Sequence, residues 1–199
     1  SMWFKRDTSA TGQTLISKDQ KEFELYFHSS ALRLYYGDTS LNGPVSSTFL
    51  AEQWYHLVVT RIGSTGSWTI KFYVNGLFST ESTTSTDPDL TTRDIYIAAE
   101  NNNGTPATKF DGQISDVRIY NTALTIDQVN ELYQERSSIY NFEEKTNLKL
   151  HLPLNHSLKD ISGNGYNGSF FGGNPSYVEN YKGDKNGALN FDGTDDFVT

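Results

Sequence analysis

The chain has 199 residues, no cysteine and a formal net charge of −8. A protein of this length can bury a substantial core in one or two domains. Its acidic balance argues against nucleic acid as a partner, because contact with phosphates requires a basic surface. No apolar run approaches the roughly 20 residues that cross a bilayer. We therefore expect no nucleic-acid binding, no membrane insertion and, without cysteine, neither disulfides nor thiolate chemistry.

Short segments of alternating apolar and polar residues, separated by Gly, Asn and Ser, predict an all-β protein. In the first third of the chain such segments cover residues 15–18, 22–27 and 32–36. In the hairpin formed by 22–27 and 32–36, one face is expected to be wet. The strongest strands are expected at 54–62 and 68–77.

Asn75-Gly76 is a tight-turn signal, which predicts that residues 77–79 fold back on 72–74. Residues 95–99 predict a buried strand. An exposed, flexible loop is expected to follow at 101–105, because Asn and Gly dominate there.

The next stretch changes its period in the middle. Residues 114–120 alternate like one strand, with Val117 and Ile119 toward a core and Asp116 and Arg118 on the other side. A strand at this point would place two opposite charges on one face.

A short helix is expected directly after that strand, near 126–136. Thr125 and Gln128 have the spacing of a capping box, and apolar residues follow at helical intervals. Residues 137–147 are polar without a clear period, which predicts a linker. Strand pattern then resumes with Leu148, Leu150 and Leu152 on one side, and a final strand is expected at 188–191.

Three parts of the chain resemble one known family. The sequence Gly112–Thr125 resembles the closing strand and helix of the laminin-G-like or pentraxin-like jelly rolls, members of the concanavalin A-like lectin/glucanase class. Residues 53–60 with 71–76 resemble the central hairpin of that family, and 150–198 resemble its opening strands. The resemblance implies a two-sheet antiparallel β-sandwich of jelly-roll type with one short helix near 126–136.

The order of these parts is reversed relative to the family. Residues 1–136 correspond to the second part of the usual domain, 137–147 to a linker and 148–199 to the opening strands. A single sandwich over 1–199 in circularly permuted order, a window cut from a tandem array, and exchange of the last segment between two chains all remain open. We favour the single sandwich, because a separate half-domain would expose apolar strands and edges. The protein is then a monomer or, with exchange, a segment-swapped dimer.

The resemblance also implies a structural cation. In the related jelly rolls an Asp of the opening loop and an outward Asp of the closing strand often meet at a metal. Here these are Asp160 and Asp116, helped by carbonyls near Gly163 and Asn164, and the implied ion is calcium, which takes six to eight oxygen ligands. The alternative is a plain turn capped by Asp160. Asp192–Asp196 offers either a second cation site or, more simply, a solvated turn.

Sugar rings are commonly held by stacking on an exposed aromatic ring together with hydrogen bonds from neighbouring polar groups. Tyr35, Tyr36 and Trp68 are candidates for such stacking, with Asn102 and Asn103 as polar loop residues. Packing in the core is the alternative for all three aromatic rings.

No catalytic pattern is visible in the sequence. Hydrolysis of a glycoside requires two carboxyl groups flanking the bond. Glu22 and Glu24 come closest, but they are expected on a wet face and lack a third carboxylate. The four histidines have no metal-ligand spacing. We expect no enzyme, but a noncatalytic module of a larger extracellular or cell-surface protein that is stabilised by calcium and recognises a glycan or a cell-surface protein. The alternatives are a spacer repeat of a surface adhesin without a ligand of its own, and a hydrolase whose carboxylates escape recognition.

Overall fold

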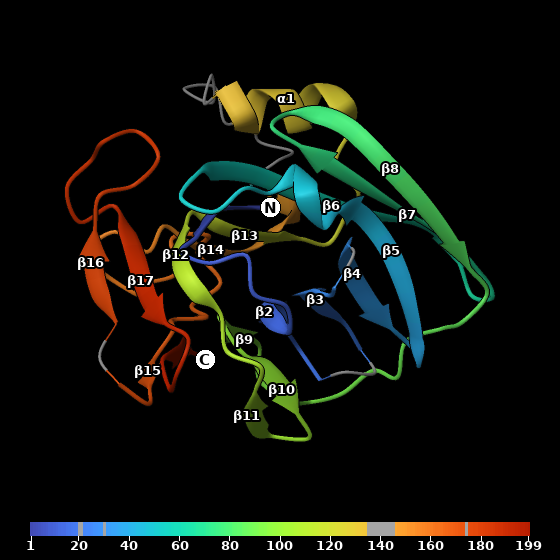
Figure 1. Ribbon diagram of the computed structural model, residues 1–199. Coiled ribbons are helices and arrows are strands. Elements are labelled where there is room, and N and C mark those ends of the chain that lie inside the picture. The colour runs from blue at the N-terminus through green and yellow to red at the C-terminus, as the bar shows by residue number, and fades with distance from the viewer. Residues whose placement is uncertain (20–21, 30, 135–145, 174) are drawn as a thin grey trace.

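The computed structural model describes residues 1–19, 22–29, 31–134, 146–173 and 175–199. Two seven-stranded antiparallel sheets pack against each other as a sandwich (Figure 1). Sheet A contains, in spatial order, β16 (Ser176–Val178), β17 (Ala188–Asp192), β12 (Asp111–Ser115), β1 (Met2–Arg6), β6 (Trp54–Ser64), β7 (Ser67–Val74) and β8 (Leu77–Thr84). Sheet B contains β15 (Phe170–Phe171), β18 (Phe197–Val198), β9 (Tyr96–Ile97), β2 (Gln13–Ser17), β3 (Glu24–Phe27), β4 (Ala31–Tyr36) and β5 (Thr39–Val45). The predicted all-β sandwich is confirmed.

The space between the sheets is filled by large apolar side chains from both of them. Aromatic rings dominate its centre, where Phe4 packs 5.7 Å from Phe27 and 5.4 Å from Phe49, measured between ring centroids. Each such ring removes a large apolar area from water, which is the main force that holds two sheets together. The fully buried phenylalanines are Phe4, Phe27, Phe49, Phe72, Phe110 and Phe191. A short 3₁₀ turn, η1 (Ser46–Thr48), precedes Phe49.

Strands from the last quarter of the chain extend both sheets. In sheet A, β17 pairs with β12, with Phe191 opposite Gly112. In sheet B, β18 pairs with β9, with Val198 opposite Ile97. A separate pair is formed by β13 (Val117–Tyr120) and β14 (Leu148–Leu152), and the three predicted leucines of β14 are all buried. The permuted order of the segments relative to the family stays a prediction.

The helix α1 (Ile126–Gln134) lies on the outside of sheet A (Figure 1). Its N-terminus has the predicted capping box, since Gln128 N donates to Thr125 Oγ1 (3.3 Å) and Thr125 N donates to Gln128 Oε1 (2.8 Å). Val129 and Leu132 pack on Val58 and Tyr73 of the sheet. The last two residues of the predicted helix lie outside the described residues, as does most of the predicted linker at 137–147.

The turn beneath the helix requires glycine. Asn75 and Gly76 have φ angles of 51° and 80°, so the predicted tight turn is confirmed, and β8 folds back on β7. A Cβ atom at position 76 would lie 2.9 Å from the ring of Tyr133. Any other residue there would push the helix away from the sheet.

Two sequence-based predictions are wrong in detail. Residues 114–120 do not form one strand, because Asp116 adopts a φ of 55° and divides it into β12 and β13. Residues 101–105 are exposed from Asn102 onward as predicted, but they are not a loop throughout, because β10 (Glu100–Asn102) and β11 (Thr105–Ala107) form a hairpin below sheet B. The Asn101 side chain organises this hairpin by accepting a hydrogen bond from Gly104 N (2.7 Å).

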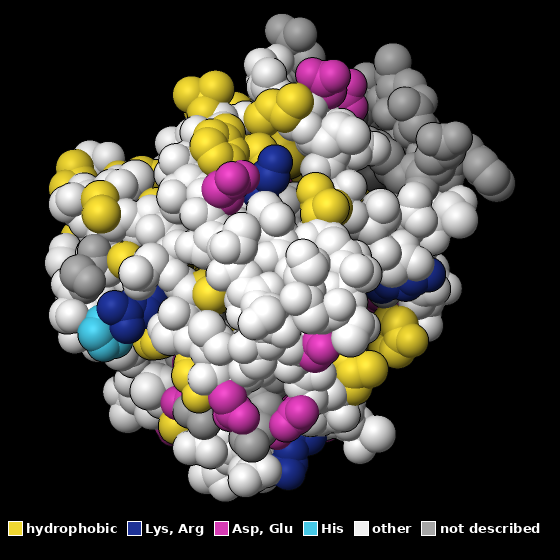
Figure 2. Space-filling model, turned by 90° about the vertical axis from the view of Figure 1, so that its right-hand side faces the viewer, with side chains coloured by type: hydrophobic (Ala, Val, Ile, Leu, Met, Phe, Trp, Pro, Cys, Tyr) yellow, Lys and Arg dark blue, Asp and Glu magenta, His cyan; other side chains and the backbone are white. Residues whose placement is uncertain are grey.

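The outer surface over β5 to β8 lacks a strong charge of either sign. Figure 2 shows this side covered mainly by uncharged polar side chains and backbone, with hydrophobic groups and single acidic and basic side chains between them. Among the described residues, no helix has the length and apolar character needed to span a membrane.

Candidate functional site

Pairing of β13 with β14 brings together three charged or titratable side chains from distant parts of the chain. Arg118 lies opposite His151 in the register, so both side chains point to the same face. Asp116, two residues before Arg118, contacts both of these side chains, and its backbone has a left-handed φ of 55°. Among non-glycine residues, Asp is one of the few that adopt this conformation readily.

The carboxylate of Asp116 is fully engaged by these neighbours. Arg118 donates from Nε to Oδ1 (2.9 Å) and from Nη2 to Oδ2 (2.8 Å) in a bidentate ion pair. His151 donates from Nε2 to Oδ1 (2.7 Å), which places the ring proton on Nε2. Burial alone would raise the pKa of Asp116, but the hydrogen bond from His151 and the charge of Arg118 hold this pKa well below its usual value. Asp116 is therefore a fixed anion.

Asp160 organises the neighbouring loop. Its Oδ1 accepts hydrogen bonds from His151 N (3.0 Å) and Ser162 N (2.8 Å), and its Oδ2 from Ser162 Oγ (2.9 Å) and Tyr166 N (3.0 Å). Burial would raise the pKa of Asp160, but these four donors lower it. Next to it, Gly163 has a φ of 95°, and the Asn164 side chain ties the loop to β14 through the carbonyl of Leu148 (3.0 Å).

Both carboxylates of the predicted calcium site thus contact His151, one through the ring and one through the backbone. Their oxygen atoms already accept hydrogen bonds, and Asp116 is neutralised by Arg118. A cation between them would have to displace the guanidinium group and several N–H donors. Calcium held by Asp116, Asp160, Gly163 and Asn164 stays a prediction.

A polar cleft of about 470 Å³ opens beside this cluster. Asp116, Arg118 and His151 form its floor, and the loops around 155 and 180–187 form its walls. The volume lies within the range of small-molecule sites in proteins, and the lining offers donors, acceptors and both signs of charge. The full lining is Ser115, Asp116, Arg118, His151, Pro153, Asn155, His156, Ile161, Asn180, Tyr181, Lys182, Asp184, Lys185 and Gly187.

The aromatic wall of the cleft is rigid. Tyr181 stacks on Trp3, with 3.7 Å between ring centroids and 6° between ring planes. Trp3 in turn packs against His56 (5.0 Å) and Tyr133 (5.6 Å). An aromatic ring that is held in this way loses little entropy when a ligand binds against it.

The residues predicted to hold a sugar do not form one site. Tyr35 is half-buried on β4, opposite Glu24 in the register. Tyr36 is only 3% exposed and accepts a hydrogen bond from Arg61, so its ring faces the core. Trp68 lies over the same Arg61 and donates from Nε1 to Asp87 Oδ1 (2.7 Å).

The two asparagines lie elsewhere, on the hairpin below sheet B. Asn102 is exposed, and Asn103 accepts a hydrogen bond from Arg93 Nη2 (2.6 Å). A ligand held by Tyr35 and the two asparagines would contact the outer face of sheet B, whereas the polar cleft lies beside β13 and β14.

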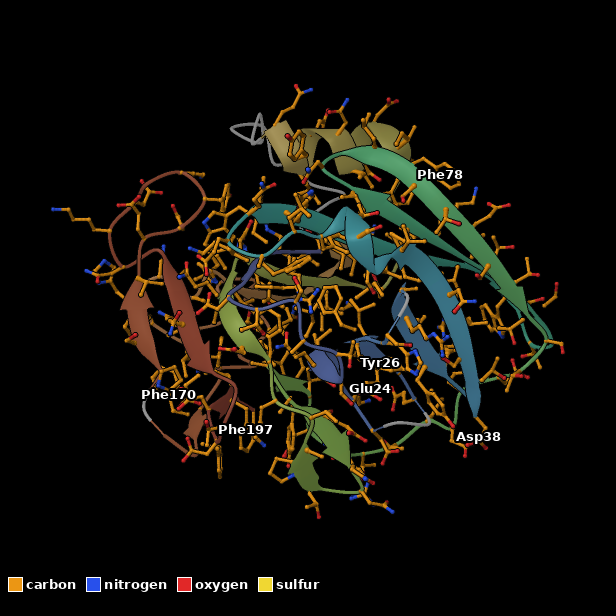
Figure 3. All side chains as sticks on the ribbon, viewed as in Figure 1. Glu24, Tyr26, Asp38, Phe78, Phe170 and Phe197 are labelled. Atoms are coloured by element: carbon orange, nitrogen blue, oxygen red, sulfur yellow. The ribbon has the colours of Figure 1, made fainter. Side chains whose placement is uncertain are left out.

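A second group of titratable residues lies where that hairpin covers sheet B. Glu24 and Tyr26 lie close together on β3 (Figure 3). Glu24 does not occupy a wet face as expected: it is 5% exposed, because the segment from Glu100 to Thr108 covers it. A chain of hydrogen bonds joins Glu24 to Thr14 (2.7 Å), Thr14 to Thr108 (2.7 Å) and Thr108 to Glu100 (2.8 Å).

The three contacts of this hydrogen-bonded series need three protons, but with both carboxylates ionised the two threonine hydroxyl groups supply only two. With both glutamates charged, each threonine would donate its hydroxyl proton to a carboxylate, and the contact between the two hydroxyl oxygens would lack a proton. One carboxyl group must therefore be protonated. Burial and the charge of Glu100, opposed by the hydrogen bond with Thr14, raise the pKa of Glu24 to about 7. We assign the proton to Glu24.

Signals for these groups in the sequence itself are weak. Asp116 and Arg118 are two residues apart on a predicted strand, which indicates a shared face, but nothing local indicates His151 as their partner. Glu100 lies far beyond Glu24 along the chain, and only the tertiary fold joins them. Asp192, Asp195 and Asp196 each offer a ligand atom, and these atoms lie within 4.8 Å of one another.

Comparisons with known proteins address the family and the fold. A laminin-G-type family model, described as the concanavalin A-like lectin/glucanases superfamily, matches residues 1–130. No curated protein matches the chain. A crystal structure of a putative carbohydrate binding protein from Bacteroides ovatus is similar over 100% of the chain, with 18% sequence identity and a TM-score of 0.57. The chain spans 51% of the length of that protein, and at this identity the likeness concerns the fold alone.

Proposed function

Because the chain belongs to the concanavalin A-like lectin/glucanases superfamily, we propose that it is a noncatalytic carbohydrate-recognition module of a larger extracellular or cell-surface protein, stabilised by calcium. The observation that carries this proposal is the polar cleft of about 470 Å³ with its rigid aromatic wall. Hydroxyl-rich ligands need many donors and acceptors at fixed positions, and the cleft supplies Asp, Asn, His, Lys and Tyr side chains.

The engagement of Glu24, Glu100 and Asp116 by neighbouring protein groups supports a noncatalytic role. A general acid and a second carboxylate must reach the bond that is cleaved. Glu24 and Glu100 are each 5% exposed and are bound to protein hydroxyl groups, so neither reaches a ligand. Asp116 is held as an anion by Arg118 and His151, which makes it a poor proton donor.

A glycan array containing neutral and acidic sugars, followed by calorimetric titration of each sugar that binds, tests the proposal. We expect Asn155→Ala and Lys185→Ala, two exposed side chains of the cleft, to weaken binding at least tenfold. Lys149→Ala is the matched control, since this exposed lysine is not part of the cleft lining. Absence of binding at millimolar sugar would refute the proposal and support the spacer function.

The same titration separates the cleft from the outer face of sheet B. If Tyr35→Ala or Asn102→Ala abolishes binding while Asn155→Ala does not, recognition takes place on that face, and the assignment to the cleft is wrong. Detectable release of a reducing sugar would instead support a hydrolase.

A further inference from the structure

The turn between β17 and β18 joins the two sheets at one corner of the sandwich. β17 belongs to sheet A and β18 to sheet B, so residues 193–196 carry the chain from one layer to the other. Figure 3 shows Phe197, which follows this turn, near Phe170 at the corner occupied by β15. Three aspartates lie within or next to this short connection: Asp192, Asp195 and Asp196.

The third aspartate is buried without adequate compensation. Asp196 is 5% exposed, and its Oδ2 has only a long hydrogen bond from Asp192 N (3.4 Å). Its Oδ1 is fully buried and has no hydrogen-bond partner. Burial raises the pKa of Asp196, and the charges of Asp192 and Asp195 raise it further. An unpaired buried carboxylate oxygen beside two other carboxylates is unfavourable unless a proton or a bound cation neutralises the charge.

The unpaired oxygen lies close to a second carboxylate. A Cβ atom built on Gly173 would collide with Asp196 Oδ1 and lie 2.9 Å from Asp195 Oδ1, so both side chains pack against this glycine. One ligand atom from each of the three aspartates lies within 4.8 Å of the others. Oxygen atoms around a divalent calcium ion, each about 2.3–2.6 Å from it, have separations of this size.

We propose that Asp192, Asp195 and Asp196 bind a hard divalent cation of the calcium type, which fixes the corner where the chain passes from sheet A to sheet B. Carboxylate oxygens are the preferred ligands of calcium, and its flexible coordination accepts further oxygens from backbone carbonyls and water. Asp111, opposite Asp192 in the register of β12 and β17, adds negative potential nearby. The positive side chain that would compete with a bound ion is Lys109, which interacts electrostatically with Asp195 and lies 4.7 Å from the centre of the Phe197 ring.

Calorimetric titration of chelator-treated protein with calcium chloride and magnesium chloride tests this site, together with thermal unfolding in each salt. We expect calcium to bind more tightly than magnesium and, at a concentration about 100 times the Kd, to raise Tm by about 5 °C or more. Asp195→Asn and Asp196→Asn should each weaken calcium binding at least tenfold. Because Asp196 is buried and its variant can lose stability for other reasons, the exposed Asp195 is the more direct test.

Two controls decide where the cation binds. Asp127→Asn removes one exposed negative charge from α1 and should leave calcium binding unchanged. Asp116→Asn should also retain it. No calcium binding by the wild-type protein, or unchanged binding by Asp195→Asn, would overturn the proposal. Loss of binding in Asp116→Asn alone would assign the cation to Asp116 and Asp160.

Discussion

Replacement of Glu24 by glutamine tests the proton that the carboxyl–threonine chain requires. If Glu24 is protonated in the folded protein, the amide group of the introduced glutamine donates to Thr14 as the acid does, and the chain of hydrogen bonds remains intact. The stability of the variant differs from that of the wild-type protein only at pH values at which the wild-type Glu24 side chain would lose its proton. The expected difference between the two proteins therefore depends on pH.

The sign of the effect follows from proton linkage. Burial, followed by the charge of Glu100, raises the pKa of Glu24 from 4.5 to about 7 in the folded protein. Between these two values the folded state binds more protons than the unfolded state, so the free energy of unfolding falls as pH rises. The contribution is complete below about pH 4.5 and is lost as pH passes through about 7. At about 1.36 kcal/mol for each pKa unit, the loss is about 3 kcal/mol.

Urea denaturation at several values between about pH 5 and pH 8 measures this loss. We expect the wild-type protein to lose about 2.5 kcal/mol relative to Glu24→Gln across this range, with the variant the more stable one at the alkaline end. The contribution of His56 to stability has the opposite pH dependence. Burial lowers the pKa of His56 to about 3, so the protein loses stability as pH falls below 6.5, where this side chain would be protonated in the unfolded chain. The difference between the two proteins cancels that contribution.

The control for this experiment is Glu131→Gln on the exposed face of α1, which should follow the wild-type curve at every pH. Parallel curves for the wild-type protein and Glu24→Gln would refute the reasoning, since Glu24 would then ionise as it does in the unfolded chain. A steeper loss of stability with rising pH in the variant than in the wild-type protein would mean that the folded protein favours the ionised form of Glu24.

Three further predictions concern the elements around the cleft and the sheets. Asp116→Asn should lower the free energy of unfolding by about 3–5 kcal/mol in urea titrations at neutral pH, because Arg118 loses its carboxylate while asparagine retains the left-handed backbone; an effect below about 1 kcal/mol would contradict a buried ion pair. Gly112→Ala should cost more than about 2 kcal/mol, since φ is 146° and a Cβ atom would collide with the carbonyl of Lys5, whereas Gly66→Ala at an open turn should cost less than about half as much. Deletion of residues 148–199 should abolish cooperative unfolding and near-ultraviolet circular dichroism, and a truncated chain that unfolds cooperatively would refute a sandwich completed by these residues.

Local signals predict the strands and turns of this protein well. The alternation over 54–62 and 68–77, the Asn75-Gly76 turn and the Thr125 capping box each depend on neighbouring residues. All are confirmed, except that the second strand ends at Val74, before the turn. The break at Asp116 could not be predicted in this way, because alternation of side chains continues through it in the sequence. Only the positive φ angle reveals that the strand ends there.

Features that depend on distant contacts are not contained in local patterns. Glu24 alternates with apolar neighbours, as residues on a wet face do, and its burial follows from the hairpin that contains Glu100. The polar cleft likewise combines Asp116 with His151 and with the loop at 180–187. The alternation pattern and the composition of one segment do not indicate which distant segment will pack over it.

The last quarter of the chain contributes both to the two sheets and to the cleft proposed for recognition. It supplies β17 and β18 to the two sheets, and it also supplies His151 and most of the walls of the cleft. Because the unfolded chain has no cleft and no gathered aspartates, a ligand bound at either place stabilises the folded state by RT ln(1 + [L]/Kd), about 2.7 kcal/mol at 100 times Kd. A sugar and a cation that bind at the two separate places should therefore raise Tm additively, since they share no residue. If one prevents the effect of the other, the cation lies in the cleft, and Asp116 with Asp160 becomes its site.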